Sequence, residues 1–170
     1  MREITCSSRL RIRELSEQDS GFILELLNTP GFLRYVGDKG VRDEDGARRY
    51  ICEGPAASYA THGFGLWLVA LKDSESPLGI CGLIKRPSLA DVDLGFAFLP
   101  QYAGQGYGRE SAAAVMDHAA KTLELERVVA ITTQDNERSI NLLRKLGFEF
   151  ERLFTMPGDE VELKLFAVNL

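Results

Sequence analysis

Apolar and polar positions alternate in the first part of the chain and then take up a helical spacing. Residues 9–13 alternate strictly, which predicts a half-buried strand. Ser16 is a suitable helix N-cap, and Asp19, three residues later, approximates a capping box. We expect a helix from there to about residues 28–31, and its inner face carries Phe22, Ile23, Leu26 and Leu27.

The pattern next predicts a second helix and three strands in series. The helix starts after Asp43, places Ala47, Tyr50 and Ile51 on one face, and ends by Gly63. Three apolar segments follow at 66–71, 78–84 and 92–99, each bounded by glycine, proline or a polar turn. Their short connections predict an antiparallel meander.

After Pro100 the order changes to alternating helices and strands. A glycine-rich turn leads into a helix with apolar residues at helical spacing: Ala112, Val115, Met116, Ala119, Ala120 and Leu123. A buried strand at 128–131, a helix at 139–146 closed by Gly147, and strands at 148–154 and 161–167 complete the chain. The strand–helix–strand unit at 92–131 predicts a right-handed parallel crossover. We therefore expect one α/β domain over residues 1–170, with an otherwise antiparallel sheet.

Length, charge and composition narrow the class of protein. The chain has 170 residues, a net charge of −5 and a pI of about 5.1, so nothing requires a basic face for nucleic acid. An acidic balance slightly favours a cationic acceptor such as an amine. No apolar run approaches the roughly 18 residues of a membrane span, and the first residues lack the apolar core of a signal peptide. We expect a cytoplasmic location.

Cysteine and histidine usage argues against metal and disulfide chemistry. Cys6, Cys52 and Cys81 are odd in number and far apart, which predicts reduced thiols, two of them in the core. His62 and His118 are the only histidines, too few for a site built on several His or Cys ligands. We expect no metal.

The glycine-rich turn is the strongest chemical signal in the sequence. Gly104, Gly106 and Gly108 stand between a strand and the first turn of a helix, where free amide groups and the helix dipole favour an anion. Three glycines in one turn cost more backbone entropy than a plain turn requires. The turn therefore predicts a diphosphate site.

Two common diphosphate motifs do not fit this turn. A Walker A loop ends in Gly-Lys-Ser/Thr, whereas this one continues as Gly108-Arg109-Glu110-Ser111. A dinucleotide fingerprint needs a glycine at its sixth position, which counted from Gly104 is Arg109. That fingerprint also follows the first strand of a parallel domain rather than the fourth strand of a mixed one.

The turn instead resembles the cofactor motif of the GNAT superfamily of N-acetyltransferases, Gln/Arg-x-x-Gly-x-Gly/Ala. The matching residues are Gln101, Tyr102, Ala103, Gly104, Gln105 and Gly106. The longer stretches 93–111 and 136–148 are similar to the branch that acetylates the N-termini of ribosomal proteins. The resemblance covers nearly the whole chain.

The resemblance implies a fold and a cofactor site. The fold is a twisted, mostly antiparallel sheet of about seven strands with about four helices, and the fourth and fifth strands splay into a V. Acetyl-CoA would be the cosubstrate, with its pyrophosphate on the turn formed by Gln101, Ala103, Gly104, Gln105, Gly106, Tyr107, Gly108 and Arg109. The backbone of Phe98 and Leu99 would pair with the pantetheine arm, and Asn136 and Ser139 would lie along it. Gly95 then marks a bulge in the fourth strand, or only relieves crowding beneath Trp67.

Acetyl transfer requires a neutral amine, a polarised thioester carbonyl and a proton for the departing thiolate. An α-amine has a pKa of about 7.7–8.0, so modest help from a base suffices. Asp93 or Asp91 could accept the proton through water, or both could be exposed charges at the strand edge. A backbone N–H on the splayed strand could stabilise the oxyanion. Glu110 has a simpler role, since a carboxylate complements the helix dipole there.

Many family members place a tyrosine acid seven residues after the asparagine, where this chain has Leu143. Ser139, one turn earlier on the same face, could hydrogen-bond the thiol sulfur, or could be only a polar residue at a helix start. Asn136 is the helix N-cap, a cofactor ligand, or both.

The outer parts of the site carry weaker signals. Arg109 contacts a phosphate or is solvated, and Arg144 and Lys145 could reach the adenosine or stay exposed. Trp67 is expected in the core rather than against substrate. Lids are expected near 30–40 and 155–160, and an exposed edge on the last strand would permit a homodimer.

The sequence thus predicts direct acetyl transfer from acetyl-CoA to a primary amine. The acceptor is either a protein N-terminus or a small amine such as a polyamine, amino acid or aminoglycoside. A non-catalytic acyl-CoA sensor is the alternative of a different class, since the usual tyrosine is missing. A nucleotide-binding protein of another kind is the remaining alternative.

Overall fold

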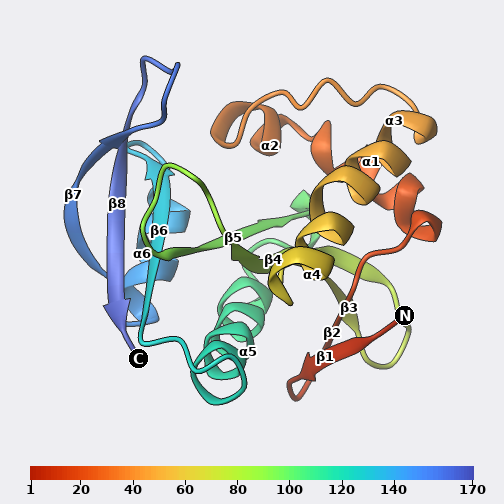
Figure 1. The fold of residues 1–170 in the computed structure, drawn as a ribbon. Coiled ribbons are helices and arrows are strands. Elements are labelled where there is room, and N and C mark those ends of the chain that lie inside the picture. The colour runs from red at the N-terminus through yellow and green to blue at the C-terminus, as the bar shows by residue number, and fades with distance from the viewer.

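The protein, seen in a computed structural model that describes residues 1–170, is built on one eight-stranded sheet with helices on both faces (Figure 1). The strand order is β1-β2-β3-β4-β5-β6-β8-β7. The strands are β1 Glu3–Cys6, β2 Leu10–Arg13, β3 Leu66–Leu71, β4 Pro77–Ile84, β5 Val92–Phe98, β6 Arg127–Thr133, β7 Glu149–Thr155 and β8 Glu162–Asn169. All neighbours are antiparallel except β5 and β6, which are parallel as the 92–131 unit predicts.

Six α-helices cover the sheet. They are α1 Ser20–Leu27, α2 Pro30–Tyr35, α3 Glu44–Ile51, α4 Ala57–His62, α5 Tyr107–Lys121 and α6 Glu137–Lys145. Short 3-10 turns precede α1 and α5, and a π-helical turn, Cys52–Ala56, joins α3 to α4. No helix is both long and apolar enough to cross a membrane.

The local signals that set the helix ends are present as predicted. Ser16 and Asp19 form a reciprocal capping box, and the Asp43 side chain accepts a hydrogen bond from the Gly46 amide. Gly63 and Gly147 take positive φ angles of 78° and 89°, which end α4 and α6.

Three features differ from the sequence prediction. The first strand, β1, and the helix α2 were not predicted, so the sheet has eight strands and the helices number more than four. The last strand lies between β6 and β7, so the edge predicted on it does not exist, and β7 is the edge strand instead. Only Cys81 is buried, because Cys6 ends the edge strand β1 and Cys52 lies on an exposed turn.

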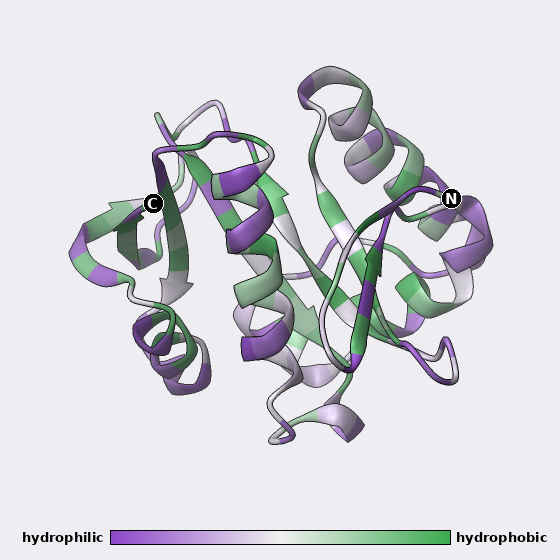
Figure 2. Cartoon of the chain, turned by 90° about the horizontal axis from the view of Figure 1, so that it is seen from below, coloured by the Kyte–Doolittle hydropathy of each residue, from purple (hydrophilic) through white to green (hydrophobic).

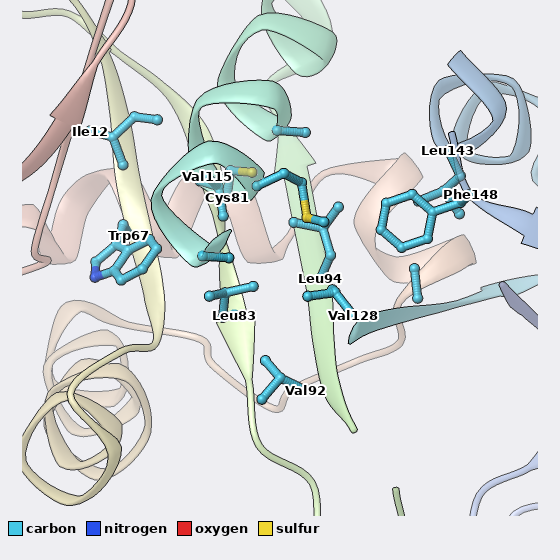
Figure 3. Close-up of a cluster of buried hydrophobic side chains, with 14 of the residues drawn as sticks. Ile12, Trp67, Cys81, Leu83, Val92, Leu94, Val115, Val128, Leu143 and Phe148 are labelled. Carbon is cyan, nitrogen blue, oxygen red and sulfur yellow. The ribbon is translucent and has the colours of Figure 1, made fainter. Parts of the chain in front are cut away.

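The sheet separates two apolar layers. One lies between the sheet and α5–α6 and includes Trp67, Leu94, Val115 and Phe148 (Figure 3). The other packs α1 and α3 on the opposite face through Ile23, Leu26 and Ile51. Trp67 is fully buried, as predicted. Viewed from below, the central strands are largely hydrophobic while the helices alternate between hydrophilic and hydrophobic residues (Figure 2), the pattern expected of helices that bury one side.

Candidate active site

The parallel strands β5 and β6 touch only at their beginnings. Their register consists of Val92 with Val128 and Asp93 with Val129, and then the strands diverge. The divergence opens a cleft of about 690 Å³, lined by β5, β6, the start of α6, the α2 segment and the β7–β8 turn. The splay that the resemblance implied is therefore present between the fifth and sixth strands of this sheet.

The splay leaves backbone groups of β5 without a neighbouring strand. The Leu99 amide donates to the Leu78 carbonyl at 2.8 Å, and hydrogen bonds to one neighbour alternate along an antiparallel strand. Phe96 and Phe98 therefore direct their backbone groups away from β4, into the splay. Leu99 does not share this property, since its carbonyl also accepts from the Tyr102 amide at 3.1 Å. The pairing role expected for Leu99 is wrong on this geometry, and Phe96 offers a free backbone edge that the sequence did not reveal.

The glycine-rich turn presents a row of unpaired amide groups. None of the backbone N–H groups of residues 104–109 donates to a protein acceptor, and the first such bond is from Glu110 to the Gly106 carbonyl. Together with the start of the 15-residue helix α5, these six donors form an anion-binding surface. Ala103 does not belong to it, because its amide is bonded to the Pro100 carbonyl.

The three glycines of the turn serve different purposes. Gly104 and Gly106 have positive φ angles of 75° and 83°, a conformation that strains most other residues. Gly108 is needed for packing instead, because a Cβ there would lie 2.9 Å from Leu142 Cδ1 of α6. The loss of backbone entropy at Gly108 is thus explained without a ligand.

The remaining turn residues divide between structural and free side chains. Gln101 is exposed and its carbonyl accepts from the Gln105 side chain, while the Gln105 carbonyl accepts from Arg9. The Tyr107 ring packs under the Arg9 guanidinium, 4.4 Å from the ring centroid. Arg109 is exposed and forms no ion pair, so its charge remains available.

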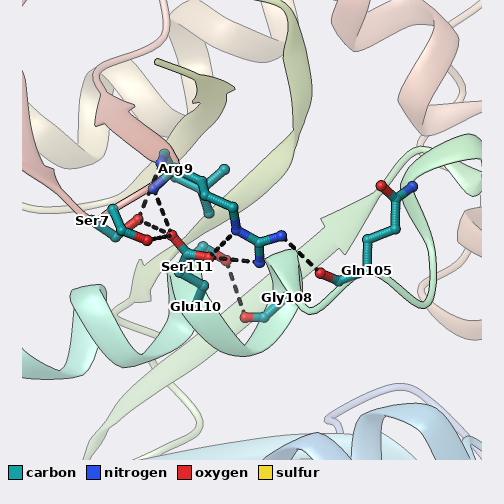
Figure 4. Close-up of polar contacts among 8 residues, drawn as sticks. Ser7, Arg9, Gln105, Gly108, Glu110 and Ser111 are labelled. Carbon is teal, nitrogen blue, oxygen red and sulfur yellow. Dashed lines mark hydrogen bonds and ion pairs between the residues drawn. The ribbon is translucent and has the colours of Figure 1, made fainter. Parts of the chain in front are cut away.

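Glu110 fastens the β1–β2 loop to the start of α5 (Figure 4). Its Oε1 accepts from Ser7 Oγ at 2.6 Å and from the Arg9 amide at 2.9 Å, and its Oε2 pairs with the Arg9 guanidinium at 2.7 Å. Partial burial would raise the pKa of Glu110, but the hydrogen bonds from Ser7 and Arg9 outweigh it and lower the pKa to about 2. Glu110 therefore does more than complement the helix dipole, and the clamp it forms with Ser7 and Arg9 has no signal in the sequence.

The two candidate bases fall in different surroundings. Asp93 is 1% exposed and lines the cleft; Arg86 Nε donates to its Oδ2 at 2.7 Å, and its Oδ1 has no hydrogen-bond partner. Burial raises the pKa of Asp93 to about 6, against the lowering effect of Arg86. Asp91 lies outside the cleft lining and pairs with Arg127 at 3.1 Å. The geometry thus corrects the pairing of the two aspartates as equal candidates: Asp91 is a surface ion-pair partner.

The start of α6 borders the cleft on its other side. The Asn136 side chain accepts from the Ser139 amide at 3.3 Å, so Asn136 is the N-cap of α6. The Ser139 hydroxyl forms no hydrogen bond within the protein and lines the cleft together with Asn136 and Leu143. Leu143 is buried, so its position contributes an apolar wall.

Two segments predicted as lids border this cleft. Residues between 32 and 39 line one side, and Met156, Pro157 and Asp159 line the other. Figure 1 shows α2 and the β7–β8 turn on opposite sides of it. Gly95 forms no bulge, because β4 and β5 pair without a register shift; a Cβ there would lie 3.0 Å from Ile84, and Trp67 is not among its nearest neighbours.

Comparison with known proteins decides the family. Residues 9–149 match the model of the acetyltransferase (GNAT) domain. The chain belongs to the GNAT family of acetyltransferases. That membership makes it an acyl-CoA-dependent N-acetyltransferase by class.

Individual members of the family are similar over most of their lengths. The uncharacterized N-acetyltransferase YnaD of Bacillus subtilis is 24% identical over 148 residues, which is 87% of this chain and 84% of the relative. Spermidine N(1)-acetyltransferase of Escherichia coli is 23% identical, over 84% and 74% of the two chains. The structure of RimL, a ribosomal L7/L12 alpha-N-protein acetyltransferase in complex with coenzyme A, superposes with a TM-score of 0.82 at 18% identity, over 99% of this chain and 98% of that one. That structural likeness shows the shared fold.

Proposed function

We propose that this acetyltransferase moves the acetyl group of acetyl-CoA directly to a primary amine that enters the cleft between β5 and β6. The observation that carries the proposal is the row of six free amides at residues 104–109, at the start of α5. These donors suit the two linked phosphates of the coenzyme.

The residues present fit acetyl-CoA along its length. The space around Gly104 is open, so a large anion can approach its backbone closely. The free backbone edge at Phe96 and Phe98 suits the amide groups of a pantetheine arm. The bound cosubstrate would supply an activated acetyl thioester.

The protein groups near the splay have distinct proposed tasks. A backbone N–H of the free β5 edge would stabilise negative charge on the thioester oxygen. Asp93 would accept a proton from the amine, because its pKa of about 6 keeps it ionised but basic at neutral pH. The Ser139 hydroxyl, which has no partner in the protein, would donate a hydrogen bond to the departing sulfur.

Direct transfer is favoured over a covalent acyl-enzyme. No cysteine lines the cleft. Cys81 is fully buried, and burial raises the pKa of its thiol to about 12, although a hydrogen bond from Ser111 opposes this. A thiolate nucleophile is therefore not at hand.

The acceptor is either a protein N-terminus or a small amine, and the family contains both kinds by name. A ribosomal-protein acetyltransferase shares the fold, and a spermidine acetyltransferase is a sequence relative. Both leave the same demand on the site, a neutral amine nitrogen beside Asp93.

The turn is tested by a matched pair of variants, Gly104→Asp and Gly104→Asn. Both side chains tolerate a positive φ, both extend into open space, and they differ only in charge. We expect the aspartate to weaken CoA binding at least tenfold more than the asparagine, measured by calorimetry, because it repels phosphate.

Equal affinity in the two variants would contradict the placement of the pyrophosphate. Thiol release from acetyl-CoA with an amine panel completes the test. Tight CoA binding without turnover would instead support a sensor module, the alternative favoured by Leu143 in place of a tyrosine.

A further inference from the structure

The cleft contains a cation that no protein carboxylate neutralises. Lys39 lies on the loop between α2 and α3 and lines the cleft, and it forms no ion pair or hydrogen bond with the protein. Its side chain stays accessible, as a ligand-binding group must. The surrounding protein and the charge of Arg86 lower the pKa of Lys39, so the two cations act on the same region.

The nearby carboxylates are already engaged. Asp38, the adjacent residue, accepts from the Gly40 amide at 2.8 Å and pairs with Arg42. Of the carboxylates that line the cleft, Asp93 pairs with Arg86, and Asp159 accepts from the Glu160 amide at 3.0 Å. Neither pairs with Lys39, so the positive charge there is left for a ligand.

The same cleft also holds a buried acceptor without a donor. Asp93 Oδ1 is buried and unpartnered, and an unsatisfied buried oxygen of this kind costs free energy unless a ligand completes it. A cleft with a free carboxylate oxygen and a free ammonium group matches a molecule that carries both charges.

We propose that the acceptor is a primary amine that also carries a carboxylate, with the amine beside Asp93 and the carboxylate bound by Lys39. This inference rests on the proposed function and names the substrate class of the same site. The carboxylate belongs either to a free amino acid or to an acidic residue near the N-terminus of a peptide. A polyamine does not fit, because its further positive charges would face Lys39 and Arg86.

The experiment compares paired acceptors that differ in the carboxylate. Alanine is paired with alaninamide, a peptide amide beginning Ala-Glu is paired with one beginning Ala-Gln, and spermidine is the polycation. Initial rates of thiol release are measured at saturating acetyl-CoA for the wild-type protein, Lys39→Met and Lys39→Arg. Methionine keeps the length of the side chain without its charge, and arginine keeps the charge.

We expect the Lys39→Met variant to raise KM about tenfold or more for the carboxylate member of at least one pair. The neutral partner of that pair should change by less than a factor of about two, as should CoA affinity. Lys39→Arg should retain most of the discrimination. The responding pair identifies whether the carboxylate comes from a free amino acid or from a peptide side chain.

Equal effects of Lys39→Met on both members of each pair would overturn the inference while leaving acetyl transfer intact. Preferred turnover of spermidine would overturn it too, as would failure of every carboxylate acceptor with an enzyme that binds CoA. Loss of the proposed function is distinguishable, because it would appear as no CoA binding and no thiol release with any amine.

Discussion

At the scale of single residues, the site depends on charges whose protonation is set by their neighbours. Asp93 and Glu110 are both carboxylates paired with an arginine, yet burial raises the pKa of Asp93 to about 6 while hydrogen bonds lower that of Glu110 to about 2. The first is suited to taking a proton and the second to remaining a fixed anion.

Replacement of Asp93 by asparagine tests the general base. We expect kcat of the wild-type protein to fall as the pH drops below about 6, since Asp93 must be ionised, and the variant to lose both this limb and about 100-fold or more in kcat. Steady-state rates from pH 5 to 8 provide the measurement, and CoA affinity should not change.

A folding control separates this role from a structural one. Because the folded protein raises the pKa of Asp93, its ionisation costs stability as the pH rises from about 4 to about 6. The stability of the wild-type protein relative to Asp93→Asn should therefore decline over that interval. An unchanged pH–rate limb in the variant would exclude Asp93 as the base.

Replacement of Glu110 by glutamine tests the clamp between the β1–β2 loop and α5. We expect a loss of about 2 kcal/mol in the free energy of unfolding at pH 7, because hydrogen bonds to a charged group are lost. The lowered pKa means that the stabilisation is complete above about pH 4.5 and disappears as the pH falls towards 2. Urea unfolding at pH 7 and at pH 3 measures both quantities. A difference between the two proteins that stays constant with pH would contradict the assigned hydrogen bonds.

At the scale of elements, the important contact is between α5, which begins with the free amides, and α6, which carries Ser139. Gly108 allows the two helices to approach, with Leu142 opposite. The glycine thereby positions the Ser139 side of the cleft relative to the turn.

A Gly108→Ala variant should be destabilised by about 1–3 kcal/mol, because its Cβ would overlap Leu142 Cδ1. Leu142→Ala removes that atom, so the double variant should recover part of the loss. A double-mutant cycle of unfolding free energies detects the coupling. Strictly additive effects would show that Gly108 has a different reason to be glycine.

At the scale of the whole molecule, the protein is two packed halves joined by a sheet that opens at one point. The pairing of β5 with β6 stops after Asp93, so the cleft exists because two strands cease to bond and not because of a separate domain. Cosubstrate is expected to approach from the α5 side, while α2 and the β7–β8 turn border the acceptor side.

Sequence patterns alone determined most of the local structure. Capping residues, glycine positions and apolar periodicity are short-range signals, and they fixed α1, α3, α5, α6, the β3–β5 meander and the diphosphate turn. They missed β1, a short strand at the sheet edge whose residues are only half-buried or exposed, and α2, a single short helix that follows a proline.

Only the tertiary structure decided which charges meet. The pairs Arg86–Asp93 and Arg9–Glu110, seven and 101 residues apart, depend on how the strands align, and nothing in the spacing of the sequence reports it. The same holds for the cleft itself: the chain encodes a strand at 92–99, but the place where its neighbour turns away, and the burial that follows for Asp93, result from packing across the whole sheet.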